Sequence, residues 1–251
     1  MIYVTGDTHG RFGRLQPGLY GQPQLTAEDT LIICGDFGGI WMGDEAEEEK
    51  LNALTKLPYT ILFADGNHEN YDLLDAYPVS EWHGGKVQII RPNLIHLMRG
   101  QIYDIEGKSF FVMGGAACHD VFNGILDPEE PDFPQKYRRL RAAGRFFRVK
   151  GASWWERELP SEEELAEGLE NLRKREMQVD YVITHCAPDT VQTAFSVVFG
   201  RNDYPQNRLT AYLGELYDTV TYKGWFCGHY HVRAELGKVT ILYENTVPIP
   251  E

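Results

Sequence analysis

The chain has 251 residues, of which 43% are hydrophobic, and its formal net charge is −13. This length allows one domain with a full core, and the negative charge disfavours a protein that binds long nucleic acids, which need an extended basic face. No apolar run approaches the roughly 20 residues of a membrane helix, and the first strand begins too early to leave room for a signal peptide. We therefore expect a cytoplasmic protein without membrane attachment.

The first two predicted strands each end in a glycine followed by an aspartate. The apolar run at residues 2–4 leads into GDTHG, which places Asp7 and His9 in the loop after the strand. The run at residues 31–34 leads into GDFGG, which places Asp36 in the corresponding loop. We expect Asp36 to lie at the same edge of the sheet as Asp7.

A helix and a third strand follow. The acidic residues 44–49 precede leucines at three-residue spacing, which predicts a helix with acids in its first turn. Residues 61–64 form the third apolar run, and Asn67 and His68 follow it. These two side chains therefore occupy the same kind of loop as the aspartates before them.

The segment 120–155 differs from its surroundings in composition. A proline-rich stretch, DPEEPDFP, precedes KYRRLRAAGRFFRVK, which has seven Lys or Arg and no acids. We expect a single domain over residues 1–251 in which 120–155 is a basic and aromatic insertion or cap. The stretch from Lys136 to Lys150 either recognises the anionic part of a substrate or forms a surface helix paired with acidic neighbours, and both interpretations stay open.

The C-terminal part repeats the strand-end pattern. An S-x-x-E capping box at Ser161 predicts the start of a helix, and leucines in residues 209–216 predict another. Two further apolar runs, residues 181–184 and 225–227, are strand-like. The histidines that follow them are His185, His229 and His231.

Five of the eight histidines thus lie just after strand-like runs, together with two aspartates and one asparagine. One such loop alone is equally compatible with an ordinary glycine-rich turn and with a functional site, but five of them are expected to converge at one edge of a sheet, where ligands bind in α/β folds. The other three histidines, His83, His96 and His119, lack this setting and are given no role.

The side chains in these loops are typical ligands of divalent metal ions. Carboxylate, imidazole and amide oxygen suit Mn, Fe, Zn or Mg, whereas the four cysteines lack the paired C-x-x-C spacing of a thiolate zinc site and are expected to be reduced core residues. We expect one ion to take Asp7, His9 and a histidine, and a second to take Asn67 and two histidines. Asp36 is expected to bridge ions roughly 3.5–4 Å apart.

In this order, GDTHG, GDFGG, GNHE, THCAP and GHYH resemble the motifs of the calcineurin-like metallophosphoesterase superfamily over residues 5–231. GGAACHD and GASWWERELPSEEE are similar to small bacterial and phage members of it. The resemblance implies an α/β fold, a four-layer α-β-β-α sandwich of two packed mixed β-sheets flanked by helices. It also implies two ligand sets, Asp7, His9, Asp36 and His231 for the first metal and Asp36, Asn67, His185 and His229 for the second.

The resemblance further implies that His68 contacts the phosphate and assists the leaving group without binding a metal. Asp36, Asn67 and His68 are the expected catalytic residues, and Asn67 and His68 are also expected to bind substrate. Arg11, directly after GDTHG, is a further candidate for phosphate contact. GDFGGIW replaces the GD-x-V-D-R-G of protein Ser/Thr phosphatases and lacks their phosphate-clamping arginine, which argues against a dedicated phosphoprotein phosphatase.

The implied activity is phosphoester hydrolysis, in which two divalent ions lower the pKa of a bridging water and direct the resulting hydroxide at phosphorus. Mn is the first choice, with Fe, Zn, Mg or Ni as alternatives. A phosphatase acting on phosphomonoesters, either a small metabolite or a phosphopeptide, is the first interpretation. A phosphodiesterase acting on cyclic nucleotides or nucleic acid is the second, and a non-catalytic scaffold of the same fold is the third. The sequence does not indicate the oligomeric state.

Overall fold

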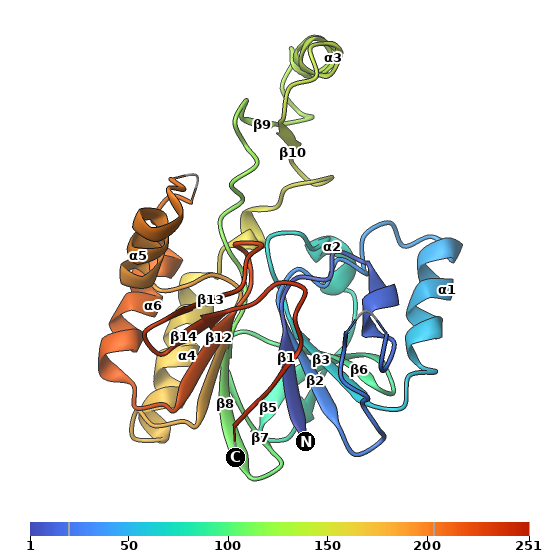
Figure 1. Ribbon diagram of the computed structural model, residues 1–251. Helices are drawn as coiled ribbons and strands as arrows, with labels where there is room; N and C mark the ends of the chain where they lie inside the picture. The colour runs from blue at the N-terminus through green and yellow to red at the C-terminus, as the bar shows by residue number, and fades with distance from the viewer. Residues whose placement is uncertain (20, 203, 251) are drawn as a thin grey trace.

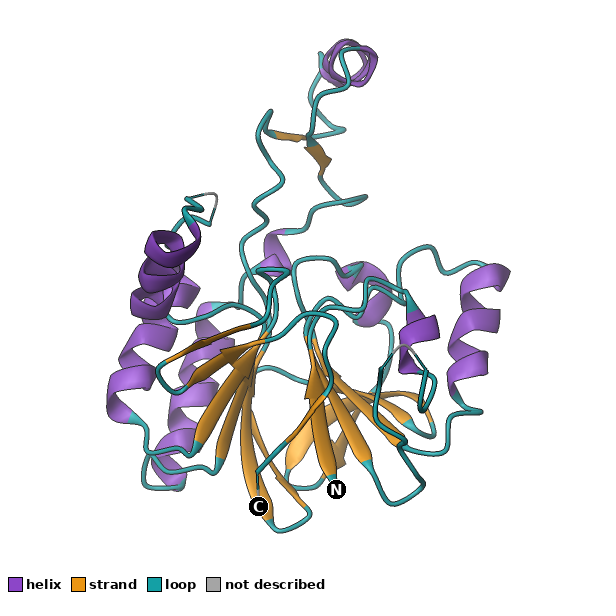
Figure 2. Ribbon diagram, viewed as in Figure 1, coloured by secondary structure: helices purple, strands orange, loops and turns teal. Residues whose placement is uncertain are grey.

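The computed structural model describes residues 1–19, 21–202 and 204–250. Two β-sheets lie face to face at the centre, and helices cover both outer faces (Figures 1 and 2). This is the four-layer α-β-β-α arrangement, so the predicted fold class is confirmed.

The first sheet has seven strands and is mixed. Its spatial order is β15 (Val247–Pro248), β1 (Ile2–Thr5), β2 (Thr30–Cys34), β3 (Thr60–Ala64), β6 (Leu94–Leu97), β5 (Gly85–Arg91) and β4 (Val79–Trp82). The central strands β1, β2, β3 and β6 are parallel, and the outer strands are antiparallel to their neighbours. The loops after β1, β2 and β3 therefore leave the sheet at one edge.

The second sheet has six strands and is also mixed. Its order is β13 (Ala234–Leu236), β14 (Val239–Ile241), β12 (Gly224–Cys227), β11 (Tyr181–Thr184), β8 (Lys108–Met113) and β7 (Gln101–Ile105). The four strands from β14 to β8 are parallel. The expectation that five loops share the edge of one sheet is wrong, because three of them follow strands of the first sheet and two follow β11 and β12 of the second. An apolar run does not reveal which sheet its strand joins.

Helices fill the outer layers on both sides of the sheets. The first sheet is covered by α1 (Glu45–Leu54) and α2 (Tyr71–Leu74), and the second by α4 (Glu162–Lys174), α5 (Asp189–Phe199) and α6 (Arg208–Thr219) (Figure 1). Two short 3-10 helices are η1 (Phe12–Leu15) and η2 (Glu156–Glu158). The predicted capping box is present at the start of α4, where Ser161 and Glu164 satisfy each other's backbone N–H groups.

The alternation of side chains along the strands divides the core into layers. All of β2 is buried, and Leu31 and Ile33 pack against Leu51 of α1, whereas Ile32 packs between the sheets with Phe110 of β8. A third layer lies between the second sheet and α4, α5 and α6. The four cysteines are free and buried, as the sequence predicted. The strand ends that carry the polar loops are therefore anchored in tightly packed sheets.

Residues 120–155 leave the sandwich as a projecting segment, named the arm below. Within it, β9 (Ile125–Leu126) and β10 (Arg148–Val149) pair in parallel, and α3 (Phe133–Ala142) lies at the far end (Figure 1). α3 has no buried residue. Little of the arm is therefore stabilised by core packing.

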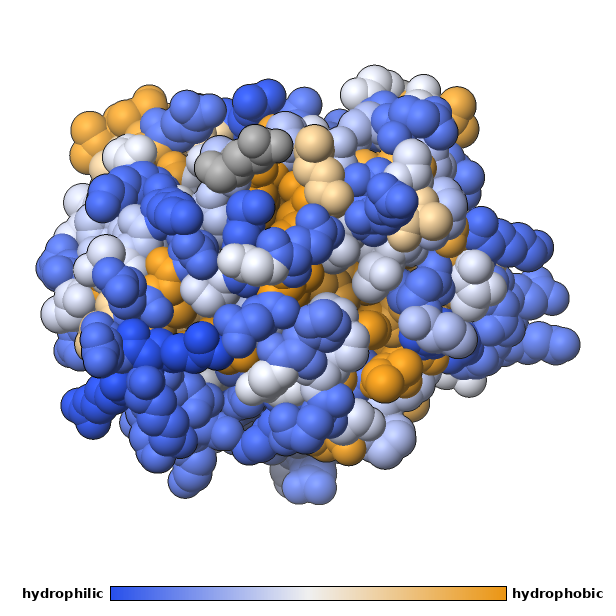
Figure 3. All heavy atoms as spheres, turned by 90° about the horizontal axis from the view of Figure 1, so that it is seen from below, coloured by the Kyte–Doolittle hydropathy of each residue, from blue (hydrophilic) through white to orange (hydrophobic). Residues whose placement is uncertain are grey.

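The face opposite the arm is mainly hydrophilic, with apolar side chains in narrow strips between polar ones (Figure 3). Among the described residues, no helix is both long and apolar enough to cross a bilayer.

Candidate metal centre

Four polar side chains from three loops form a compact cluster at the strand ends. They are Asp7 and His9 after β1, Asp36 after β2 and His231 after β12, and one ligand atom of each lies within 4.8 Å of those of the others. The Nε2 atoms of His9 and His231 are 3.0 Å apart, and Asp7 Oδ2 is 3.1 Å from His231 Nε2. The structure thus brings together the four side chains expected to hold the first metal.

A second group shares Asp36 with the first. His185 Nε2 lies 3.2 Å from Asp36 Oδ1 and 3.3 Å from Asn67 Oδ1, and the His229 ring centroid is 5.0 Å from that of His185. The other oxygen of Asp36, Oδ2, lies 3.8 Å from His9 Nε2. Asp36 therefore stands between the two groups.

The donor set fits two divalent cations. Asp7, Asp36 and His185 are 2%, 1% and 0% exposed, so their ligand atoms face one another and not solvent. Two imidazole nitrogens directed at each other, with carboxylates on both sides, form a poor hydrogen-bonding arrangement but a suitable cage of N and O donors for a cation. The amide nitrogen of Asn67 is buried and has no hydrogen-bond partner among the described residues, so only its oxygen is engaged with the cluster.

The backbone at four of these residues is in the left-handed region. His9, Asp36, His229 and His231 have φ values of 46°, 49°, 71° and 51°. Residues other than glycine rarely adopt this conformation, and it persists only where the surrounding structure enforces it. Here the amides of Thr8 and His9 donate to Asp36 O at 3.0 and 2.9 Å. Hydrogen bonds between the loops therefore hold the ligands in a strained geometry.

Glycines in the motifs permit the close approach of loops. A Cβ on Gly66 would lie 2.1 Å from Asp36 Oδ1, and a Cβ on Gly228 would lie 2.1 Å from Asp7 Oδ1. At both places a backbone amide close behind the glycine donates to the same carboxylate. After Gly66, His68 N donates to Asp36 Oδ1 at 2.8 Å, and after Gly228, His229 N donates to Asp7 Oδ1 at 2.9 Å. Glycine at these positions is a steric requirement of the site.

Charge and burial shift the ionisation of the two central groups in opposite directions. Burial lowers the pKa of His185, but the facing Asp36 carboxylate outweighs it and raises that pKa to about 10. Burial raises the pKa of Asp36, but the imidazoles of His185 and His68 outweigh it and hold that pKa well below its usual value. Each group thus favours the charged form of the other.

His68 lies at the side of the cluster. Its ring centroid is 5.2 Å from that of His9, and its Nε2 is 3.9 Å from Asp120 Oδ2. Burial lowers the pKa of His68 to about 4; the charge of Asp36 opposes this shift, and the charge of Arg148 adds to it. His68 therefore adjoins the ligands and also faces the base of the arm.

The sequence did not reveal three side chains near the site. Asp120 accepts a hydrogen bond from Arg148 Nη2 at 2.8 Å and lies 3.4 Å from His119 Nε2, and the His119 ring is 5.3 Å from that of His229. Asp120 and His119 lie in GGAACHD, well beyond the end of β8, so the strand-end rule does not find them. Arg148 lies in the basic stretch 136–150, but local pattern does not distinguish it from the other cations there, because the pairing of β9 with β10 brings it to the site.

Polar and charged side chains support the candidate ligand loops from behind. Arg14 donates to Asp7 O at 2.6 Å, and Glu69 accepts from the amides of the loop after Asp36. Asp65, at the end of β3, forms a buried pair with Arg99, whose Nη2 is 2.5 Å from Asp65 Oδ2. These contacts fix the loops to the sandwich.

Arg11 is exposed and lines a pocket of about 620 Å³ together with Arg14 and Arg233. None of the described residues lining that pocket is an expected metal ligand. The role of Arg11 in phosphate contact stays a prediction.

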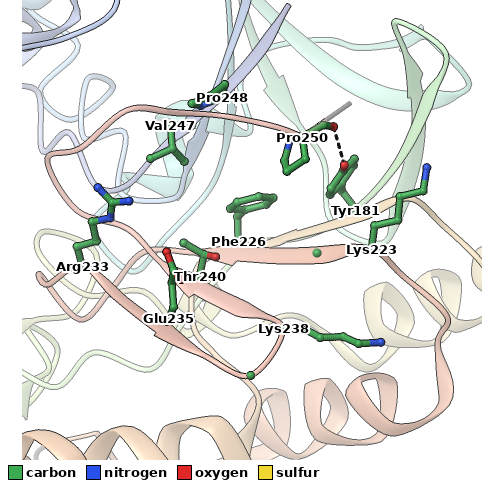
Figure 4. Close-up of a pocket in the computed structure, with 12 residues that line it drawn as sticks. Tyr181, Lys223, Phe226, Arg233, Glu235, Lys238, Thr240, Val247, Pro248 and Pro250 are labelled. Carbon is green, nitrogen blue, oxygen red and sulfur yellow. Dashed lines mark hydrogen bonds between the residues drawn. The ribbon is translucent and has the colours of Figure 1, made fainter.

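A second pocket, of about 550 Å³, lies between the C-terminal segment and β12 to β14 (Figure 4). Tyr181 and Phe226 line it, and the Tyr181 hydroxyl donates to Pro250 O at 2.8 Å. It contains none of the expected site residues, so the candidate metal centre is a separate feature.

A family model described as calcineurin-like phosphoesterase matches residues 1–233. Among solved structures, a Staphylococcus aureus protein named as a 5′-nucleotidase, in complex with alpha-ketoglutarate, is 13% identical, with a TM-score of 0.42 over 96% of this chain and 48% of that one. This chain thus spans about half of that protein. The phosphopantetheinyl hydrolase of Mycobacterium tuberculosis is 14% identical, with a TM-score of 0.45 over 96% of this chain and 87% of that one. No curated protein gives a significant match.

Proposed function

Because the chain belongs to the calcineurin-like phosphoesterase family, a family of metal-dependent phosphoester hydrolases, we propose that it is a phosphatase that acts on phosphomonoesters. The observation that carries the proposal is the position of Asp36, whose Oδ1 lies 3.2 Å from His185 and whose Oδ2 lies 3.8 Å from His9. One carboxylate facing two ligand groups is the arrangement that a pair of adjacent cations requires.

We propose two sets of ligands that share Asp36. They are Asp7, His9, Asp36 and His231 for one ion, and Asp36, Asn67, His185 and His229 for the other. We propose Mn²⁺ as the metal, since the donors are oxygen and imidazole nitrogen without thiolate. Two such ions, when bound, supply an activated water and neutralise charge on the phosphoryl oxygens.

The other residues of the site orient the substrate and handle protons. His68 is proposed to contact the phosphoryl group and to give a proton to the leaving oxygen, because it adjoins the ligand cluster without being part of it. A bound phosphate dianion favours its protonated form, which opposes the effect of burial. Asn67 is proposed to hold its oxygen toward the second ion, which leaves its amide N–H₂ for a phosphoryl oxygen.

Small phosphate esters fit the charge distribution better than long nucleic acids. Three of the seven basic residues in 136–150 pair with acids of the arm: Lys136 with Glu130 at 2.9 Å, Lys150 with Asp127 at 2.8 Å and Arg148 with Asp120 at 2.8 Å. These pairs interrupt the basic stretch, and the net charge of −13 over the whole chain further disfavours binding of many phosphates, which needs an extended basic face. The proposed substrates are therefore small phosphorylated metabolites or phosphopeptides.

The test compares p-nitrophenyl phosphate with bis-p-nitrophenyl phosphate as substrates of the protein loaded with Mn²⁺. We expect a higher kcat/KM for the monoester, and no turnover of either ester by an Asp36→Asn variant. A higher kcat/KM for the diester would replace the proposed phosphatase with a phosphodiesterase. Hydrolysis of neither ester by protein that carries two ions would favour the non-catalytic scaffold.

A further inference from the structure

The base of the arm brings one arginine to the metal centre. Arg148 is the first residue of β10, where it pairs with Ile125 of β9 and its backbone N–H donates to Gly124 O at 3.2 Å. Its side chain is 19% exposed. The backbone position of Arg148 is therefore fixed by the two-stranded sheet at the foot of the arm.

The guanidinium of Arg148 lies next to His68. Its Nη2 donates to Asp120 Oδ2 at 2.8 Å, and the same oxygen is 3.9 Å from His68 Nε2. A single carboxylate oxygen thus separates the arginine from the histidine beside the ligand cluster. A phosphoryl group bound at the ligands and in contact with His68 would come within reach of this guanidinium.

Three other described cations of the arm contact partners that also lie in the arm. Lys136 and Lys150 pair with acidic residues of the arm, and Arg141 Nη1 donates to the Tyr137 hydroxyl at 2.7 Å. Asp120, the partner of Arg148, also belongs to the arm. It is the one acid in contact with a described cation of the arm that also faces His68. The loop after β2 offers no alternative, because residues 36–43 contain no Lys or Arg.

We propose that Arg148 binds the phosphoryl oxygens of the substrate and selects phosphomonoesters over phosphodiesters. This inference rests on the proposed function, since it names the residue that distinguishes substrate classes at the same site. An arginine has five N–H donors in a planar fork, so the bond to Asp120 leaves donors for a phosphoryl group. A monoester carries up to two negative charges and a diester only one, so the added cation favours the monoester.

The hydrogen bond to Asp120 also preorganises the Arg148 side chain. The carboxylate holds the guanidinium in place before substrate arrives, so less side-chain freedom is lost on binding. The arm thereby contributes to recognition through its base, while α3 at its far end does not.

The test uses Arg148→Gln, which removes the charge and the fork but keeps a polar side chain, and Arg148→Lys, which keeps the charge without the fork. With Mn²⁺ bound, Arg148→Gln is expected to raise the KM for p-nitrophenyl phosphate about 10- to 100-fold, the range of a hydrogen bond to a charged group. Its KM for bis-p-nitrophenyl phosphate is expected to change less than about threefold. Arg148→Lys should recover part of the loss. The matched control is Arg138→Gln, at an exposed arginine of α3, which should leave both values unchanged.

Calorimetric titration with inorganic phosphate tests the same contact without turnover. We expect the Kd for phosphate to rise in Arg148→Gln by about the factor seen in KM and to stay at the wild-type value in Arg138→Gln. An equal loss on both esters with unchanged phosphate affinity would show that Arg148 only joins the two strands of the arm, and would overturn the inference. If the wild type hydrolyses neither ester, the proposed function fails, but the phosphate titration still decides whether Arg148 binds a phosphoryl group.

Discussion

The candidate metal centre and the outer arm, which is the part of the arm around α3, are stabilised in different ways. Asp7, Asp36 and His185 are almost fully buried, and loops from both sheets hold them through backbone N–H bonds and tight glycine contacts. The outer arm has a helix without a buried residue, and Phe146 beside it is 71% exposed. The first region depends on the packed sandwich, whereas the second is stabilised mainly by local contacts. Changes in the two regions should therefore have very different consequences.

The largest effect is expected at the shared carboxylate. Asp36→Asn keeps the size of the side chain but removes the charge that faces both ligand groups. We expect metal loading and turnover to be lost together, as measured by elemental analysis of the purified protein and by hydrolysis of p-nitrophenyl phosphate. Metal-dependent activity retained in this variant would show that Asp36 does not bridge two ions.

A change beside the ligands should separate metal binding from catalysis. His68→Ala is expected to lower kcat by about 10²- to 10⁴-fold, the usual contribution of an acid–base group, because the leaving oxygen loses its proton donor. The metal content should stay near that of the wild type. A matched loss of metal and activity would mean that His68 belongs to the ligand set.

Removal of one partner of the buried ion pair behind the site should lower the stability of the protein. The Arg99 and Asp65 side chains are 3% and 1% exposed, so Arg99→Ala would leave the carboxylate buried and without its cation. We expect the free energy of unfolding to fall by about 3–5 kcal/mol in denaturant titrations. The control is Lys150→Ala in the exposed pair with Asp127, which should leave the unfolding midpoint unchanged. Similar midpoints for the two variants would remove the contrast between the regions.

The smallest effect is expected at the far end of the arm. Replacement of residues 133–142 by a Gly/Ser linker of equal length removes α3, which buries no side chain. The Tm should shift by less than about 3 °C, and metal content should be unchanged. Scanning calorimetry and elemental analysis measure both. A large drop in either would show that α3 supports the sandwich.

The same contrast explains what could be predicted from the sequence. The ligand loops follow strands whose apolar runs are continuous, so Asp7, Asp36 and His185 could be located from local pattern alone. The assignment of those strands to two sheets could not, because burial on both faces gives the same run in either sheet.

The residues at the foot of the arm were beyond the reach of local pattern. Asp120 and Arg148 meet only because β9 and β10 pair, and this contact joins positions 28 apart in the chain. The basic stretch that contains Arg148 was visible in the sequence, but which of its cations faces the site depends on the fold of the arm.

The central claim is that loops from two sheets hold two adjacent cations that share Asp36. Anomalous diffraction from crystals grown with Mn²⁺ tests this most directly. The account predicts two peaks roughly 3.5–4 Å apart, one beside Asp7 and His231, the other beside Asn67 and His185, with Asp36 between them. A single peak, or peaks that Asp36 does not join, would contradict it.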